Sequence, residues 1–241
     1  MPRRVVLIGA TGFFGRRLGA RLAAMDGIDL TVTSRHADRA EDLAKGLAGG
    51  RKPTALAFER DDLESVARLM RSAPWLVIDA SGPFQSANYD LARAAIGAGS
   101  HWIDLADARG YLLGFGDALN ETAVASGVVA RAGASSTPAL SMAAVTALTQ
   151  GWRRVDSIDI AIMPGGAADV GEAVVRAILS YSGRPITTFA EGRAQAITGW
   201  GSIRRLVVDQ IGVRYVSPVE TADAALMATR FGVTSRVSFS E

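Results

Sequence analysis

The sequence predicts an α/β chain, in which a doubly wound parallel sheet is followed by a smaller α+β domain. Three observations support this fold class. An apolar strand from Val5 to Ile8 runs directly into three glycines spaced three residues apart. Strand-like and helix-like stretches then alternate with short connections as far as about residue 148. After residue 151 the pattern changes: a strand with one apolar face comes first, and short strand-like segments interrupted by glycines follow it.

The first strand is suited to burial on both faces because it is a continuous apolar run. Behind the glycines, apolar residues recur every four positions, which predicts an amphipathic helix. Glycine lets the backbone approach a phosphate closely, and the free N–H groups and dipole of a helix start favour negative charge. An alternative is a tight turn without a ligand. We predict a dinucleotide site that includes Gly9, Thr11, Gly12, Phe13, Phe14 and Gly15.

The second strand, residues 28–33, ends at Ser34 and Arg35. In dinucleotide folds an acidic residue near this position holds the ribose 2′-hydroxyl, whereas an arginine accommodates a 2′-phosphate. The chain has no acidic residue here before Asp38. We therefore expect NADP as the cofactor, bound through Ser34 and Arg35, with NAD as the alternative. Arg35 also fits the start of a solvated loop.

The rest of the first domain, placed at residues 1–150, continues the alternation. An acidic cap at Asp61 and Asp62 opens one of its helices. Right-handed crossovers should make this a Rossmann sheet, whose sites lie at the carboxyl ends of the strands. We expect strands at 54–58, 75–78, 101–105 and 128–130, and helices at 37–47, 61–70, 86–98, 110–126 and 139–148.

Three segments at strand ends carry candidate residues. The first is the backbone of residues 80–84, which fits the nicotinamide half of a cofactor or an ordinary turn. The second contains Asp104 and Asp107, which could hold a substrate ammonium or donate a proton, or else form caps and an ion pair with Arg109. In the third, Ser135 and Ser136 could bind a carboxylate near a helix start, or simply cap that helix. The first segment's candidates are Ala80, Ser81, Gly82 and Pro83.

The second domain, placed at residues 151–241, is expected to be an α+β domain for substrate binding or dimerisation. The pattern predicts a strand at 155–162, a turn at Pro164–Gly166, a helix at 171–180, and strands at 203–208, 212–216 and 233–239. Because the chain stops at Glu241 without a closing element, we expect this domain to be incomplete. If the protein self-associates, this domain should form the homodimer.

Composition narrows the function classes. The chain is 49% apolar and 21% charged, and no apolar run reaches the roughly 18 residues of a membrane span. It enters its first strand directly, so we expect a cytoplasmic protein. Cysteine is absent and the only histidines are His36 and His101, so we expect no metal site. A net charge of +2 with scattered arginines argues against nucleic acid. The expected partner is a small-molecule substrate.

Several mechanisms are excluded by missing residues. None of the four tyrosines is followed four positions later by lysine, as short-chain reductases require. A cysteine nucleophile is impossible, and no G-x-S-x-G elbow exists for serine hydrolysis. Hydride transfer assisted by a carboxylate or water remains, as does binding alone.

Four motifs in order resemble the saccharopine dehydrogenase-like NAD(P)-binding family, over about residues 4–145. They are GATGFFG at 9–15, VIDASGPF at 77–84, HWIDLAD at 101–107 and GASSTPALS at 133–141. The resemblance implies a Rossmann domain joined to an α+β domain and an NAD(P) cofactor. In biosynthetic members it also implies reductive joining of an amino acid to an aldehyde through an imine, with the substrate near Ser81, Asp104 and Ser135.

The leading hypothesis is an NADP-preferring oxidoreductase that transfers hydride to or from an amino-acid-like imine or oxo substrate, with Asp104 as the catalytic residue. The rival hypothesis is a non-catalytic NAD(P)-binding sensor or interaction protein. A methyltransferase on a similar sheet is less favoured, because no acidic residue ends the second strand to hold a ribose.

Overall fold

The computed structural model describes residues 1–163 and 172–240. Contacts within the chain divide it into two compact units. Unit 1 comprises residues 1–106 and 114–134, and unit 2 comprises residues 107–113 and 135–241. Residues 135–150, which we had placed with the first domain, therefore group with the second unit.

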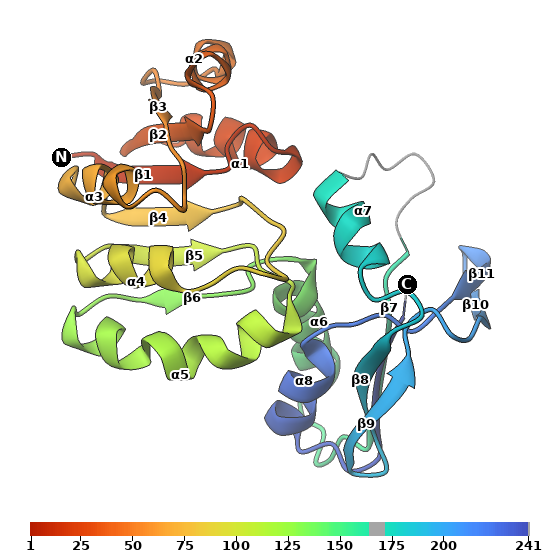
Figure 1. The fold of residues 1–241 in the computed structure, drawn as a ribbon. Coiled ribbons are helices and arrows are strands. Elements are labelled where there is room, and N and C mark those ends of the chain that lie inside the picture. The colour runs from red at the N-terminus through yellow and green to blue at the C-terminus, as the bar shows by residue number, and fades with distance from the viewer. Residues whose placement is uncertain (164–171, 241) are drawn as a thin grey trace. The chain divides into compact units, whose positions relative to one another are not determined.

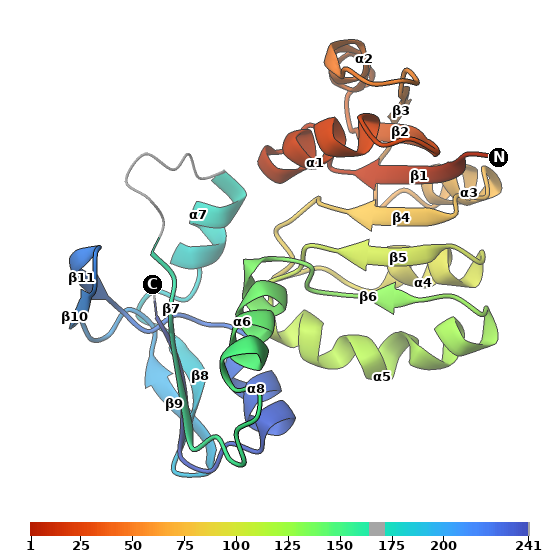
Figure 2. The same cartoon turned by 180° about the vertical axis from the view of Figure 1, so that it is seen from behind.

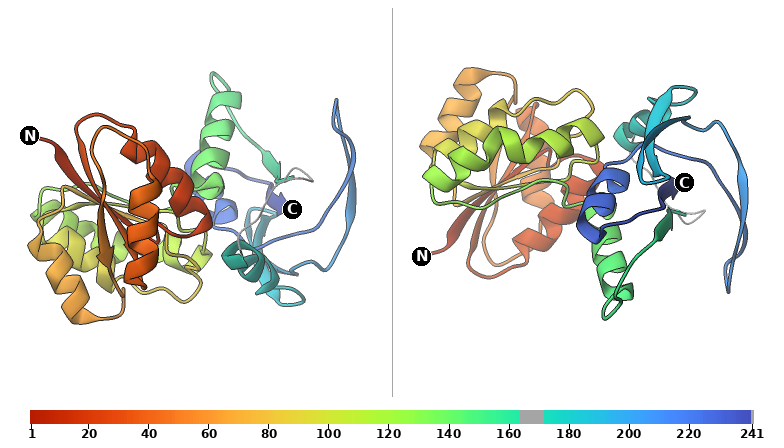
Figure 3. Two further views of the ribbon diagram at one scale, coloured as in Figure 1. Left: turned by 90° about the horizontal axis from the view of Figure 1, so that it is seen from above. Right: turned by 90° about the horizontal axis from the view of Figure 1, so that it is seen from below.

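Unit 1 is a six-stranded parallel sheet in the order β3-β2-β1-β4-β5-β6 (Figure 1). Its strands are β1 (Arg3–Ile8), β2 (Ile28–Ser34), β3 (Thr54–Ala57), β4 (Leu76–Asp79), β5 (His101–Asp104) and β6 (Ala130–Arg131). Its helices are α1 (Phe13–Ala23), α2 (Ala37–Gly46), α3 (Leu63–Arg71), α4 (Asp90–Gly97) and α5 (Arg109–Ala125), the last of which begins in unit 2. Helices α1 and α2 cover one face and α3 and α4 the other (Figure 3), as right-handed crossovers require. The predicted doubly wound sheet is confirmed.

The core of unit 1 forms around β1 because that strand is apolar along its buried length. Val5 and Leu7 are almost completely buried and pack with residues of β2, α1 and α2. Each such side chain contributes about 1.5–3 kcal/mol to folding. Asp62 caps α3 as predicted, and its carboxylate accepts hydrogen bonds from the backbone N–H groups of Glu64 and Ser65 at 3.1 and 3.2 Å.

Several element boundaries differ from the prediction, among them the starts of β6 and α4. Strand β6 begins at Ala130 rather than at residue 128, because the N–H of Val128 bonds back to the carbonyl of Ala123 at the end of α5. Helix α4 begins at Asp90 rather than at residue 86. The backbone N–H of Asp90 bonds to the Asn88 side chain, so the chain turns just before the helix starts.

Unit 2 is a smaller α+β unit, as expected. Its four-stranded sheet has the order β7-β12-β8-β9, and β10 and β11 form a separate pair (Figure 2). The strands are β7 (Ser157–Ala161), β8 (Pro185–Ala190), β9 (Arg193–Thr198), β10 (Arg204–Val208), β11 (Gly212–Val216) and β12 (Arg236–Ser240). The helical segments are the π-turn η1 (Ser136–Leu140), α6 (Ser141–Leu148), α7 (Glu172–Leu179) and α8 (Asp223–Phe231). The expected turn at 164–166 lies outside the described residues.

Helices α6 and α8 pack against the four-stranded sheet around a core that includes Val145, Ile158, Met227 and Val237. Helix α8 and strands β8 and β9 were not predicted from the sequence. Helix α8 ends at Gly232, whose φ of +60° is the left-handed conformation that glycine adopts readily.

Asp223, at the start of α8, is completely buried and accepts hydrogen bonds from the hydroxyls of Ser141 and Thr221. Burial nevertheless raises the pKa of Asp223 above its ordinary value. A carboxyl group whose pKa is raised by folding stabilises the folded state fully below the pKa it has in the unfolded chain, about 3.9 for aspartate. This stabilisation is lost as pH rises through the pKa of the folded state. The advantage of wild type over Asp223→Asn in urea unfolding should therefore shrink from about pH 4 to about pH 7.

Asp159 provides the matched control with the opposite sign. Burial raises its pKa, but hydrogen bonds from Ser238 and Arg236 outweigh burial and hold the pKa below the ordinary value. Its contribution is present above the unfolded pKa and is lost as pH falls through the folded pKa. The advantage of wild type over Asp159→Asn should therefore stay nearly constant between about pH 5 and pH 7 and should shrink as pH falls below about 4, where the advantage over Asp223→Asn is largest. Parallel trends for the two variants would contradict this assignment.

Candidate functional site

The carboxyl ends of four neighbouring strands bring the predicted residues of unit 1 to one edge of the sheet. The register of β1 with β2 pairs Leu7 with Val32, so Gly9 continues level with Ser34. On the other side of β1, Ile8 pairs with Asp79, and Asp79 in turn pairs with Asp104 on β5. The glycine turn therefore lies between the end of β2 and the end of β4, as in other dinucleotide folds.

The glycine turn fits a phosphate because side chains are excluded from it. Gly9 has a φ of +71°, and a Cβ there would lie 2.8 Å from the backbone of Ala80 and Ser81. A Cβ on Gly15 would lie 2.1 Å from the carbonyl oxygen of Gly9. Apart from its own chain neighbours, a Cβ on Gly12 would come within 4 Å of a single atom of the described residues, that same oxygen, at 3.2 Å. Gly9 and Gly15 thus serve the close packing of the turn, whereas Gly12 is much less crowded.

Helix α1 starts at this turn without competition for its N–H groups. No side chain among the described residues caps it at Gly12, and its first turn holds no acidic residue. Two arginines instead lie against the turn: Arg16 Nε donates to the Thr11 carbonyl at 2.8 Å, and the Arg17 guanidinium lies 3.8 Å from the centre of the Phe13 ring. These arginines were not predicted as site residues. They add positive charge where the helix dipole already favours an anion.

The end of β2 presents one buried and one exposed residue. Ser34 is buried, and its hydroxyl accepts the N–H of His36 at 3.3 Å. Arg35 is exposed next to it. An exposed guanidinium one residue beyond the strand is free to move towards a phosphate. The contact of Ser34 and Arg35 with a 2′-phosphate stays a prediction.

The end of β4 is held by an ion pair that sequence reasoning missed. Asp79 is completely buried, and its Oδ1 accepts the N–H and the hydroxyl of Ser81 at 2.8 and 2.5 Å. Arg60, from the loop after β3, lies 3.6 Å from Asp79 Oδ2 and donates to the Ser81 hydroxyl at 3.1 Å. Asp79 Oδ2 has no hydrogen bond among the described residues. The Arg60–Asp79 pair thus fixes the start of the segment that contains Ala80, Ser81, Gly82 and Pro83.

Asp104 at the end of β5 is also completely buried. Its Oδ2 accepts the indole N–H of Trp102 at 2.9 Å, and its Oδ1 accepts the N–H groups of Ala106 and Gly133 at 3.1 and 2.9 Å. The carboxylate therefore fastens the end of β5 to the loop that follows β6. Proton transfer by Asp104 stays a prediction.

A tyrosine that was not predicted lies near this carboxylate. Burial raises the pKa of Tyr89 first, and the negative charges of Asp104 and Asp117 raise it further. The Tyr89 ring also contacts Phe115 edge to face, with the ring centres 6.1 Å apart. Like an ordinary tyrosine, Tyr89 is protonated at neutral pH, and its raised pKa extends this to higher pH, so its hydroxyl can donate a hydrogen bond close to Asp104. The signal for this residue in the sequence is weak, because Tyr89 is followed four positions later by Arg93 and so lacks the lysine of a Tyr-x-x-x-Lys pair.

The remaining substrate candidates belong to unit 2. Asp107 is half-buried just after the β5 segment. Ser135 precedes η1 without capping it through its side chain, and Ser136 is exposed. Arg109 pairs with Glu220, with its Nε 3.7 Å from Oε1. Burial raises the pKa of Glu220, while the N–H of Thr187 and the charge of Arg109 oppose that shift. The substrate roles of Asp107, Ser135 and Ser136 stay predictions.

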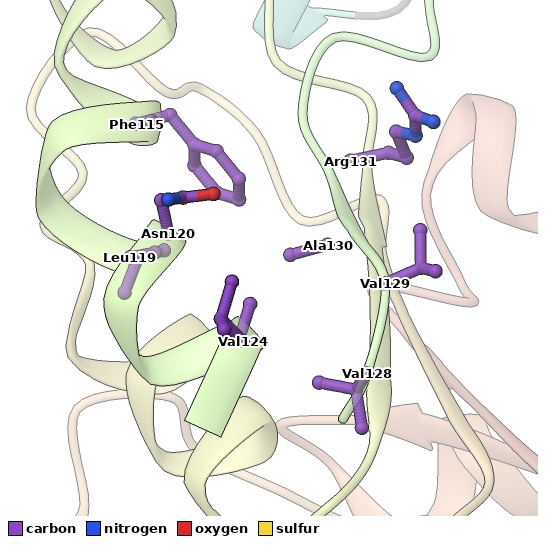
Figure 4. Close-up of a pocket in the computed structure, with 10 residues that line it drawn as sticks. Phe115, Leu119, Asn120, Val124, Val128, Val129, Ala130 and Arg131 are labelled. Carbon is purple, nitrogen blue, oxygen red and sulfur yellow. The ribbon is translucent and has the colours of Figure 1, made fainter. Parts of the chain in front are cut away.

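A groove of about 320 Å³ lies elsewhere in unit 1, between helix α5 on one side and strand β6 with the residues just before it on the other (Figure 4). It contains none of the predicted site residues. Its lining is formed by Phe115, Gly116, Leu119, Asn120, Ala123, Val124, Val128, Val129, Ala130 and Arg131. We assign no part of the cofactor site to it, because the strand ends carry the residues suited to a dinucleotide.

The described residues contain neither a cluster that could hold a metal ion nor a helix that could span a membrane. Residues 1–163 and 172–240 hold no group of three or more histidine, cysteine, aspartate or glutamate side chains placed to bind a metal ion. In the same residues no helix is both long and apolar enough to cross a bilayer. A cytoplasmic location stays a prediction.

The fold and the glycine turn define a Rossmann-type dinucleotide-binding protein. Residues 5–145 match the family model described as the saccharopine dehydrogenase NADP binding domain. The chain belongs to this family, and residues 5–145 form an NADP-binding domain of oxidoreductase type. A search of curated proteins found no match.

Solved structures with a similar fold are distant. The Bacillus subtilis protein yvaA is 12% identical, with a TM-score of 0.49 over 99% of this chain and 64% of its own. GenD2 from gentamicin A biosynthesis, solved with NAD, is 18% identical, with a TM-score of 0.49 over 99% of this chain and 66% of its own. A short-chain dehydrogenase from Sphingobium yanoikuyae, solved with NADPH, is 20% identical, with a TM-score of 0.42 over 55% of this chain and 69% of its own. This chain thus spans slightly less than two thirds of the first two proteins. At these scores the likeness carries no functional argument.

Proposed function

We propose that the protein is an NADP-preferring oxidoreductase that acts on the imine or oxo group of an amino-acid-like substrate. The observation that carries the proposal is the turn at Gly9–Gly15, where Cβ atoms are excluded and the helix start lacks a cap. Bound NADP(H) accepts or supplies the hydride. The N–H groups of the turn would hold the pyrophosphate, and Ser34 and Arg35 would hold the 2′-phosphate.

The substrate side of the proposal rests on residues with matching charge and hydrogen bonding. An amino-acid-like substrate carries an ammonium and a carboxylate. Asp107 offers a negative charge for the ammonium, and the hydroxyls of Ser135 and Ser136 offer donors for the carboxylate. Asp104 is proposed at the reacting end of the site, where it would orient the substrate directly or hold the surrounding loops in place. The family resemblance supports this choice of substrate class.

A non-catalytic NADP-binding protein is the second candidate, and one observation favours it. The Asp104 carboxylate already accepts three N–H groups and is completely buried, which leaves it little capacity to exchange a proton with a substrate. Absorbance at the NADPH band, followed while oxo-acid and amino-acid pairs are screened, separates the two candidates. Turnover with any pair supports the enzyme, whereas tight NADPH binding without turnover across the screen supports the second candidate.

Arg35→Ala tests the cofactor preference. Loss of a charge-assisted hydrogen bond costs about 1.5–3 kcal/mol, so the Kd for NADPH should rise roughly ten- to hundredfold. NADH lacks the 2′-phosphate, so its affinity should not change. Calorimetry of both cofactors in one buffer measures the two values.

Arg21→Ala is the control for that change. Arg21 lies in the last turn of α1 and is exposed, so its removal alters the net charge equally without touching the turn. It should bind both cofactors as wild type does. If Arg35→Ala weakened NADPH and NADH equally, Arg35 would not be the residue that reads the 2′-phosphate.

A further inference from the structure

Arg109, the first residue of α5, belongs to unit 2 and carries a guanidinium that is only partly used. Its Nε lies 3.7 Å from Oε1 of Glu220, which is too long for a hydrogen bond. Both atoms are buried, and neither has a hydrogen-bond partner within residues 1–163 and 172–240. Because buried polar atoms normally find partners, this ion pair is incomplete at the point where its two charges meet.

The outer edge of the Arg109 guanidinium is open. Its two terminal nitrogens make no hydrogen bond to any described residue, and both reach solvent, since Nε is the only buried nitrogen of this side chain that lacks a partner. Solvent reaches 30% of the side chain. A planar guanidinium can hold a carboxylate through two parallel N–H···O bonds. Arg109 therefore offers its two terminal nitrogens to a ligand while Nε stays beside Glu220.

Glu220 is a poor counter-ion for Arg109. Its other carboxylate oxygen, Oε2, accepts the backbone N–H of Thr187 on β8 at 3.3 Å. Burial raises the pKa of Glu220, and neither that N–H nor the positive charge of Arg109 cancels the rise. The folded chain thus disfavours the charged carboxylate despite the ion pair. A pair that does not stabilise its own charges adds little to folding, and this is the pattern expected of a binding group.

The neighbouring sequence supplies the opposite charge that an amino acid requires. Asp107 lies two positions before Arg109 in the same segment of unit 2, and it is the residue proposed above for the substrate ammonium. We propose that Arg109 binds the carboxylate of the substrate. This inference rests on the proposed function and narrows its substrate to one with a free carboxylate. Ser135 and Ser136 would then add hydroxyl donors without supplying charge.

Binding of L-alanine to the full chain, followed by NMR with and without NADPH, tests the proposal. L-Alanine carries the two charges common to all amino acids, and L-alaninamide lacks only the carboxylate. Wild type should bind L-alanine with a Kd on the order of 1–10 mM and L-alaninamide about tenfold more weakly. NADPH binding is measured separately by calorimetry, so a failure of the cofactor site is distinguished from a failure at Arg109.

Arg109→Lys keeps the positive charge beside Glu220 but loses the planar pair of donors. It should unfold in urea as wild type does and bind L-alanine about tenfold more weakly. Arg153→Gln is the control, because Arg153 is an exposed arginine of unit 2 in the loop before β7. It should bind L-alanine as wild type does.

Glu220→Gln separates a binding role from a structural one. Glutamine can still accept the N–H of Thr187, and it removes the negative charge that competes for Arg109. L-Alanine should therefore bind about threefold more tightly. If the pair only stabilised the fold, Glu220→Gln would not improve binding. Equal affinity of wild type for L-alanine and L-alaninamide, or unchanged binding in Arg109→Lys, would overturn the proposal.

Discussion

Gly12→Ala should retain its fold but bind NADPH about a hundredfold more weakly. Among the described residues, the new methyl group would be tight against the Gly9 carbonyl oxygen alone, at 3.2 Å, and a displacement of a few tenths of an ångström by the methyl-bearing residue relieves that contact without moving β1 or α1. Gly12 has an ordinary φ of −73°, so alanine introduces no backbone strain there. The methyl group would, however, occupy the open side of the turn, and the pyrophosphate could no longer reach the N–H groups of α1. Calorimetry with NADPH and urea unfolding measure the two effects separately.

Gly15→Ala should instead damage the fold itself. Its Cβ would lie 2.1 Å from the Gly9 oxygen and 2.8 Å from the Ala10 Cα, and neither backbone atom can move without displacing β1 or α1. We expect a loss of about 3 kcal/mol or more in unfolding free energy. Gly46→Ala, at a helical glycine whose Cβ would meet nothing within 4 Å, is the control and should not lower stability.

The two glycine variants also distinguish packing from ligand binding. If Gly12→Ala bound NADPH as wild type does, the phosphates would not lie at this turn. If Gly15→Ala were as stable as wild type, the turn would not need the close approach of helix and strand. The expected pattern is a binding defect alone in the first variant and a stability defect in the second.

The helices and strands of unit 1 were predictable because the sequence patterns that indicate them lie within or next to each element. Strand β1 is a continuous apolar run followed by glycine, and α3 begins with its own cap at Asp62. Unit 2 offered fewer such signals. Strands β8 and β9 are paired across a two-residue connection in which Glu191 and Gly192 both have positive φ, and their threonines and alanines do not alternate clearly. Their stability depends on tertiary packing, which a local pattern does not record.

The places of the candidate site residues in the fold were predictable, but their pairings were not. The rule that sites lie at the carboxyl ends of strands located Ser34, Ser81 and Asp104 along one edge. It did not reveal that Arg60 pairs with Asp79, because Arg60 lies in the loop after β3 and Asp79 ends β4, and the two residues meet only in the folded sheet. A signal was nevertheless present: an aspartate ending an apolar strand must find partners if it is buried.

Asp104→Asn should lower the unfolding free energy by about 2–3 kcal/mol. Asparagine can keep one carbonyl oxygen towards the N–H groups of Ala106 and Gly133, but its amide then turns an N–H towards the indole N–H of Trp102. Two buried donors would face each other without an acceptor. Trp102→Phe removes the indole donor, so in the double variant Trp102→Phe/Asp104→Asn the losses should fall short of additivity by about 1–2 kcal/mol.

The same cycle separates a catalytic Asp104 from a positioning one, once a substrate is known. If Asp104 exchanges a proton with the substrate, Asp104→Asn and the double variant should be equally inactive, whatever their stability. If Asp104 acts by holding β5 to the loop at Gly133, the double variant should turn over about as fast as Trp102→Phe alone, because asparagine can still accept the N–H groups of Ala106 and Gly133. Because three N–H groups already occupy the carboxylate, we expect this second result. A double variant that is inactive while Trp102→Phe alone is active would return Asp104 to the role of acid or base.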